Sequence, residues 1–149
     1  GLPRPDALQA ILRPPPRTRA EAEERGRSIM QVIGSTGIPV DLDFVAAQAG
    51  RAFERSFYPP GFARQFLAVL ASPDRTERLR GLRVPAVVIH GAVDPLTDRS
   101  GGEATAAAIP GAELLVIEGM GHDMPRAAWP IITDAIVRNA GRAAPSSSV

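Results

Sequence analysis

Two short runs of branched apolar residues constrain this chain most, because each has the length and composition of a β-strand buried on both faces. The first run occupies residues 84–90 and the second occupies residues 113–117. A helical pattern over residues 100–109 separates them, and an amphipathic stripe over residues 129–140 follows. Strand, helix, strand, helix predicts two parallel strands joined by a right-handed crossover. The expected fold class is therefore α/β.

The chain before the first strand is expected to be helical. Thr18 and Glu21 have capping-box spacing, which predicts a helix that stops at Gly34. Asp41 is an N-cap candidate for a second helix, which the prolines after Tyr58 should break. Apolar residues at helical spacing predict a third helix. Its members are Phe62, Phe66 and Leu70, and shorter helices are expected over residues 6–12 and 74–80.

These patterns divide the chain into three parts. Residues 1–81 are expected to form a helical cap or lid, residues 82–140 the strands and helices of the core, and residues 141–149 a disordered tail. The cap holds six of the seven aromatic side chains, and we expect most of them to pack between its helices. The six are Phe44, Phe53, Phe57, Tyr58, Phe62 and Phe66.

Composition excludes several classes of function. The 149 residues are enough to bury a core, and the 17 basic residues are interleaved with 16 acidic ones, so nucleic acid is not an expected partner. No run approaches the roughly 18 apolar residues of a membrane-spanning helix, and no signal peptide opens the chain, so we expect no membrane partner and a cytoplasmic protein. The absence of cysteine excludes a disulfide or a thiolate nucleophile.

The loops that follow the two strands contain the residues best suited to chemistry. Asp94 follows the first strand, and His122 follows the second within a Gly-Met-Gly-His sequence. Because the carboxyl ends of adjacent parallel strands meet at one edge of a sheet, we expect these two side chains to lie together. An imidazole can take and return a proton near neutral pH, and a carboxylate can hold it in the required tautomer. The sequence thus predicts the base and the acid of a catalytic triad.

Three other side chains compete for these roles. His90 ends the first strand and precedes a glycine, so we interpret it as a structural imidazole. Asp98 and Asp123 are rival acids for the histidine. Asp123 directly follows His122, and adjacency favours a side chain that faces away from the imidazole. Asp94 is therefore the preferred acid.

The order of these motifs resembles the α/β-hydrolase superfamily, whose triad runs Ser, Asp or Glu, then His along the chain. The matching pieces are Val84-Pro85, His90-Gly91-x-x-Asp94-Pro95-Leu96, Ile109-Pro110-Gly111-Ala112 and Gly119-Met120-Gly121-His122, and together they cover residues 82–139. The cap looks most like that of aclacinomycin methylesterase-type serine ester hydrolases, on Gly34-Ser35-x-Gly37-x-Pro39, Tyr58-Pro59 and Ala71-Ser72-x-Asp74-Arg75-Thr76. The resemblance implies the C-terminal part of an α/β hydrolase, with Asp94 as acid and His122 as base.

The nucleophile of that family is not recognisable here. A serine hydrolase places it in a Gly-x-Ser-x-Gly turn after a strand, and Ser28, Ser35 and Ser100 each lack one of the flanking glycines. We therefore expect the front half of the sheet, with its serine and oxyanion donors, to be absent from this chain. The expected partner is that missing N-terminal half, and the unpaired strand edge could also support self-association.

Three functions remain open. The preferred one is hydrolysis of a small-molecule carboxylic ester through a Ser-Asp-His triad whose serine lies outside this chain. A carboxylate nucleophile would instead give a dehalogenase or an epoxide hydrolase, and a non-catalytic fragment would be a binding module. No cofactor and no metal are expected, because the two histidines lie on different loops and no glycine-rich phosphate-binding turn follows a strand.

Overall fold

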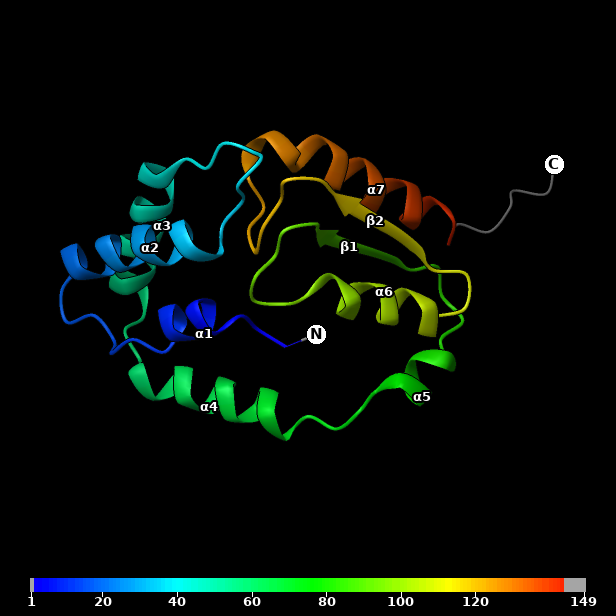
Figure 1. Ribbon diagram of the computed structural model, residues 1–149, viewed down its shortest axis with the longest axis horizontal. Coiled ribbons are helices and arrows are strands. Elements are labelled where there is room, and N and C mark those ends of the chain that lie inside the picture. Colours follow the sequence, from blue (N-terminus) through cyan, green and yellow to red (C-terminus); the bar gives the residue numbers. More distant parts are fainter. Residues whose placement is uncertain (1, 144–149) are drawn as a thin grey trace.

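The computed structural model describes residues 2–143, which form a cap of helices followed by a two-stranded sheet flanked by helices (Figure 1). In chain order the elements are α1 (Pro5–Ile11), α2 (Arg19–Ile33), α3 (Leu42–Arg55), α4 (Pro59–Ala71), α5 (Thr76–Arg80), β1 (Val87–Gly91), α6 (Arg99–Ala108), β2 (Glu113–Ile117), a 3-10 turn at Arg126–Ala128 and α7 (Trp129–Gly141). Every predicted helix and both predicted strands are present.

The cap helices begin where their capping residues predict. The Thr18 hydroxyl accepts a hydrogen bond from the Glu21 amide at 3.1 Å, and the Asp41 carboxylate accepts one from the Phe44 amide at 2.9 Å. Each bond satisfies a backbone donor that the first turn of a helix leaves unpaired. The prolines at Pro59 and Pro60 begin α4, since proline fits the first turn of a helix.

Strands β1 and β2 pair in parallel, with Val87 opposite Glu113 and Gly91 opposite Ile117. Helices α6 and α7 lie on opposite sides of the pair (Figure 1). The core beneath α7 is built from β2, from the loop and the 3-10 turn after it, and from α7 itself. Its members are Ile117, Met120, Ala128 and Ile132, with Ile38, Ile89 and Leu115 packed against them. The predicted parallel strand pair is confirmed.

Helices α2 and α3 form a hairpin at one end of the molecule (Figure 1). Small residues allow this close packing: a Cβ added at Gly26 would lie only 2.9 Å from the Cβ of Ala49, and Ala22 and Ala46 are buried. An exposed arginine links the same two helices, because Arg19 forms an ion pair with Glu54 at 2.6 Å. The hairpin therefore rests mainly on apolar packing, since exposed ion pairs contribute little.

Helix α4 differs from the other cap helices, because none of its residues is buried. It runs apart from the α2–α3 hairpin and the sheet in Figure 1. Phe62 and Leu70 are 50% and 66% exposed. The prediction that most cap aromatics pack between helices is therefore wrong: Phe57, Tyr58 and Phe62 are exposed, and Phe44, Phe53 and Phe66 are only partly buried. The physical reason is that the apolar face of α4 has no partner within the described residues.

The end of the described chain differs from the predicted boundary. Helix α7 includes Gly141, which the sequence assigns to the tail, and Arg142 donates hydrogen bonds to Glu113 and to the Gly111 carbonyl. Residues 144–149 of the predicted tail lie outside the described residues. No helix between residues 2 and 143 combines the length and the apolar character that crossing a membrane would require.

Candidate active site

Asp94 lies in the turn that follows β1, and backbone amides fix its carboxylate. One oxygen, Oδ1, accepts hydrogen bonds from the amides of Leu96 and Thr97 at 2.8 and 2.9 Å. The side chain is only 7% exposed. Aspartate commonly makes such bonds to amides a few residues on in a turn, which explains why the chain reverses here. The second oxygen, Oδ2, is left for another partner.

His122 lies in the turn that follows β2, and a glycine makes this turn possible. Gly119 has a φ of 73°, a left-handed conformation that a residue with a side chain adopts only with strain. The His122 amide then donates a 2.7 Å hydrogen bond to the carbonyl of Ile33, at the end of α2. The imidazole itself is 42% exposed. The turn thus holds the backbone of His122 firmly while its ring remains accessible.

The two side chains meet as the sequence predicts. His122 Nδ1 lies 2.8 Å from Asp94 Oδ2, although 28 positions separate the residues along the chain. A carboxylate can only accept, so Nδ1 donates the proton of this bond. Nε2 is then the nitrogen that can accept a proton from a substrate or a nucleophile. The pair has the geometry of the acid and base of a catalytic triad.

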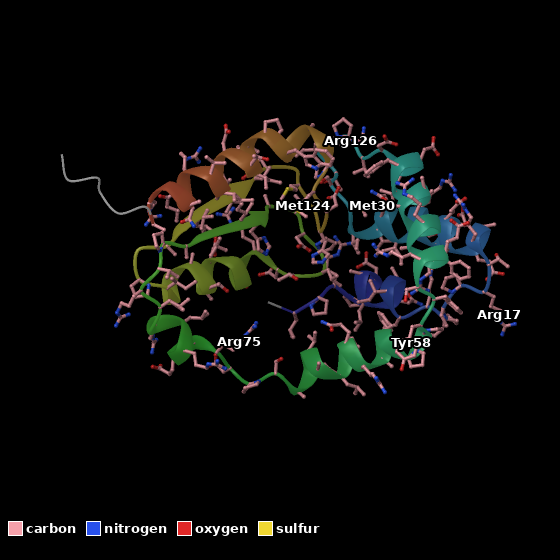
Figure 2. The ribbon with its side chains drawn as sticks, turned by 180° about the vertical axis from the view of Figure 1, so that it is seen from behind. Arg17, Met30, Tyr58, Arg75, Met124 and Arg126 are labelled. Carbon is pink, nitrogen blue, oxygen red and sulfur yellow. The ribbon has the colours of Figure 1, made fainter. Side chains whose placement is uncertain are left out.

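An open pocket of about 340 Å³ adjoins this pair. Met124, which is 68% exposed, lines it together with His90 and His122, and the buried Met120 also borders it. Figure 2 shows Met124 beside Met30 and Arg126, where the cap meets the sheet-bearing part of the chain. Flexible methionine side chains adapt to apolar groups of varied shape. The site can therefore accommodate an apolar part of a small molecule next to the imidazole.

Both rival acids are engaged elsewhere. Asp98 caps α6 by accepting bonds from the hydroxyl and the amide of Ser100, and the hydroxyl bond is the main reason that the pKa of Asp98 lies below its ordinary value. Asp123 Oδ1 accepts bonds from the hydroxyl and the amide of Ser35 at 2.6 and 2.8 Å. Of the three candidate acids, only Asp94 is bonded to His122.

The other histidine has a packing position. Nδ1 of His90 lies 2.9 Å from the carbonyl oxygen of Gly91. The ring lies against α6, where a Cβ added at Gly102 would come within 2.6 Å of it. His90 thus fills the space between β1 and α6. This position fits the structural role expected for it.

The three serines considered from the sequence all donate to neighbouring oxygens. Ser28 donates to the Glu24 carbonyl within α2, Ser35 to Asp123 and Ser100 to Asp98. Within residues 2–143, no group of three or more His, Cys, Asp or Glu side chains has an arrangement that could hold a metal ion. The expected absence of a cofactor and of a metal stays a prediction.

The contact between Ser35 and Asp123 is a feature that the sequence does not predict. These residues lie 88 positions apart, and no periodicity links the end of α2 to the turn after β2. One sequence signal points to this contact, because both segments contain two closely spaced glycines. The segments are Gly34-Ser35-Thr36-Gly37 and Gly119-Met120-Gly121. Two glycine-rich segments are what a close backbone crossing requires.

Glycine at position 91 is needed for the His122 turn to pack against the end of β1. A Cβ at Gly91 would overlap the carbonyl oxygens of Met120 and Gly121, which are backbone atoms that cannot rotate away. We expect Gly91→Ala to lower the free energy of unfolding by about 1 to 3 kcal/mol, the usual effect of overpacking. Urea unfolding followed by circular dichroism measures it. Gly141→Ala is the control, because a Cβ there meets nothing within 4 Å, and an equal loss in both variants would contradict the assignment.

Comparison with solved structures identifies the fold. The chain is similar to a meta-cleavage product hydrolase (CumD) from Pseudomonas fluorescens IP01, with a TM-score of 0.63 and 20% sequence identity over 97% of this chain and 53% of that one. This chain has the C-terminal part of the α/β-hydrolase fold. In this chain the Asp94–His122 pair lies beyond the carboxyl ends of β1 and β2.

Two further α/β-hydrolase structures give the same result. Esterase RhEst1 from Rhodococcus sp. ECU1013 matches with a TM-score of 0.62 and 21% identity, over 91% of this chain and 46% of that one. Carboxylesterase CesB (YbfK) from Bacillus subtilis matches with a TM-score of 0.59 and 14% identity, over 92% and 46%. The chain therefore spans about half the length of these hydrolases. A scan against protein-family models found no match.

Proposed function

We propose that this chain supplies the acid and the base of a carboxylic ester hydrolase whose nucleophilic serine lies on a segment outside residues 1–149. The observation that supports this most is the 2.8 Å bond between His122 Nδ1 and Asp94 Oδ2, beside an open pocket. Similar folds occur in proteins named as an esterase and a carboxylesterase. The proposed substrate is a small ester with an apolar group that fits against the methionine side chains.

In this function His122 accepts a proton and passes it on in each of two half-reactions, acylation and deacylation. Its Nε2 takes the proton of the serine hydroxyl while the serine oxygen bonds to the ester carbonyl carbon. When the tetrahedral intermediate collapses, the carbon–oxygen bond to the alcohol breaks and His122 returns the proton to that oxygen. Water then attacks the acyl carbon while His122 takes one of its protons. The bond from that carbon to the serine oxygen breaks, His122 gives the proton to the serine oxygen, and the carboxylic acid is released. Asp94 stays ionised throughout and stabilises the imidazolium.

The missing segment has a defined place to dock in this proposal. Strand β1 pairs with β2 alone among the described residues, and a two-stranded sheet is rarely stable by itself. Large apolar side chains are exposed near the sheet and on α7, including Val84 at 63% and Val137 at 64%. The matched hydrolases are about twice as long as this chain, so the proposed occupant is the remaining strands of the same fold rather than a second copy.

The decisive experiment uses the product of the complete reading frame that encodes this chain, treated with a fluorophosphonate probe and digested for mass spectrometry. We expect hydrolysis of short p-nitrophenyl esters and a label on one serine outside residues 1–149. A label on a serine within residues 1–149 would overturn the assignment of the nucleophile. If the protein is not labelled but opens epoxides or removes halide, the alternative with a carboxylate nucleophile is favoured. If the protein is neither labelled nor active on any of these substrates, the remaining alternative is a non-catalytic binding module.

The 149-residue chain provides a separate prediction. We expect it to show no ester hydrolysis that depends on His122, because an acid and a base without a nucleophile or oxyanion donors have little to catalyse. The measurement compares hydrolysis of an unactivated alkyl ester, ethyl butyrate, by the chain and by its His122→Ala variant at equal concentration, because an exposed imidazole alone does not attack such an ester. A higher rate for the unsubstituted chain would mean that it contains its own nucleophile.

A further inference from the structure

The turn that bears His122 is bonded to the cap at three consecutive residues. The Gly121 amide donates to the Ser35 hydroxyl oxygen at 3.1 Å, and the His122 amide donates to the Ile33 carbonyl at 2.7 Å. The Asp123 carboxylate accepts from Ser35. Their two partner residues, Ile33 and Ser35, lie at and just after the end of α2. Nothing in the ester hydrolysis scheme requires these contacts as such.

The Ser35 hydroxyl has only one possible arrangement of its proton. The Gly121 amide can only donate, so the hydroxyl oxygen accepts that bond. The hydroxyl proton therefore points to Asp123 Oδ1, at 2.6 Å. Asp123 Oδ1 also accepts from the Ser35 amide. The serine side chain thus joins the residues on both sides of His122.

Backbone packing brings the two segments into direct contact. A Cβ at Gly121 would overlap the backbone of Gly34, and a Cβ at Gly37 would lie 2.7 Å from the Cα of Gly119. The amides of Thr36 and Gly37 both donate to the Gly119 carbonyl, at 3.1 and 3.0 Å. Such a crossing leaves the turn no room to shift without breaking several hydrogen bonds at once.

We infer that Ser35 and Asp123 are positioning residues that fix the His122 turn to the cap; this inference rests on the proposed function. Asp94 orients the imidazole ring from the sheet, while Ser35 and Asp123 hold the backbone that carries the ring from the cap. The cap therefore contributes to the alignment of the base as well as bordering the pocket. Ser35 acts through the turn and touches no reacting atom.

The test uses the product of the complete reading frame and two NMR measurements that need no activity. We expect Ser35→Ala to speed hydrogen exchange at the Gly121 and His122 amides at least about tenfold, because local opening then breaks fewer bonds. At about pH 9, where an ordinary imidazole is neutral, the fraction of His122 in the Nδ1–H tautomer should fall as the ring loses its alignment with Asp94. Ser28→Ala is the matched control, since it removes a hydroxyl bonded only within α2.

A second pair of variants covers the case in which Ser35→Ala fails to fold. Asp123→Ala removes the acceptor for Ser35, whereas Asp123→Asn keeps an oxygen in its place. We expect the alanine variant alone to change the exchange and the tautomer. Unchanged values in both alanine variants, or equal changes in Ser28→Ala, would overturn the positioning role. An inactive reading-frame product with the expected exchange pattern would instead count against the proposed function alone.

Discussion

Replacing His122 with alanine in the product of the complete reading frame is expected to lower kcat for ester hydrolysis by about 10³- to 10⁶-fold, with little change in KM. The ring is the group placed to accept the proton, because its Nδ1 is committed to Asp94 Oδ2 at 2.8 Å. Without it a serine hydroxyl attacks as a weak neutral nucleophile. The loss corresponds to roughly 4 to 8 kcal/mol of transition-state stabilisation. Steady-state kinetics on a p-nitrophenyl ester measures it.

The matched control for that substitution is the chain's other histidine. His90 packs between β1 and α6, borders the pocket and is not bonded to Asp94, so His90→Ala is expected to reduce stability and can change KM while changing kcat less than about tenfold. Circular dichroism of both variants establishes that they remain folded. If His122→Ala retains turnover close to that of the unsubstituted protein, His122 is not the base and the proposed function fails.

The sequence was sufficient to predict the pairing of Asp94 and His122. Two physical rules lead to this prediction. Short runs of branched apolar residues form buried strands, and adjacent parallel strands bring their carboxyl ends to the same edge of the sheet. The N-terminal ends of α2 and α3 were equally predictable. The side chains of Thr18 and Asp41 accept hydrogen bonds from amides only three residues further along the chain. What these features share is that each depends on local sequence or on strand order. Neither requires knowledge of how the cap packs.

The contact between the cap and the His122 turn was not predictable in the same way. It depends on where the end of α2 crosses the turn after β2, and this crossing is set by tertiary packing between segments more than 80 residues apart. The wrong prediction that most cap aromatics are packed between helices has the same origin in α4. Its apolar spacing predicts a buried face, but burial needs a partner, and the described residues supply none. Periodicity identifies a helix and its apolar face without identifying what covers that face.

Asp94→Asn is expected to lower kcat for ester hydrolysis nearly as much as His122→Ala does, although asparagine preserves the size of the aspartate side chain. Asp94 Oδ1 accepts two backbone amides, so an amide oxygen would occupy that place and the NH₂ group would face His122. Nδ1 would then have to accept, which puts the imidazole proton on Nε2, where the serine proton has to go. We expect kcat to fall about 10⁴-fold.

The Asp123→Asn variant of the same product separates this effect from a general loss of charge near the base. Asp123 Oδ1 accepts from Ser35, and an amide oxygen can accept the same two bonds, so its kcat should fall less than about tenfold. The two variants each remove one negative charge from residues beside His122, and only one of them reverses the imidazole tautomer. Parallel kcat measurements decide between the two acids. A larger loss in Asp123→Asn than in Asp94→Asn would make Asp123 the acid and would require the His122 ring to turn away from Asp94 in the assembled enzyme.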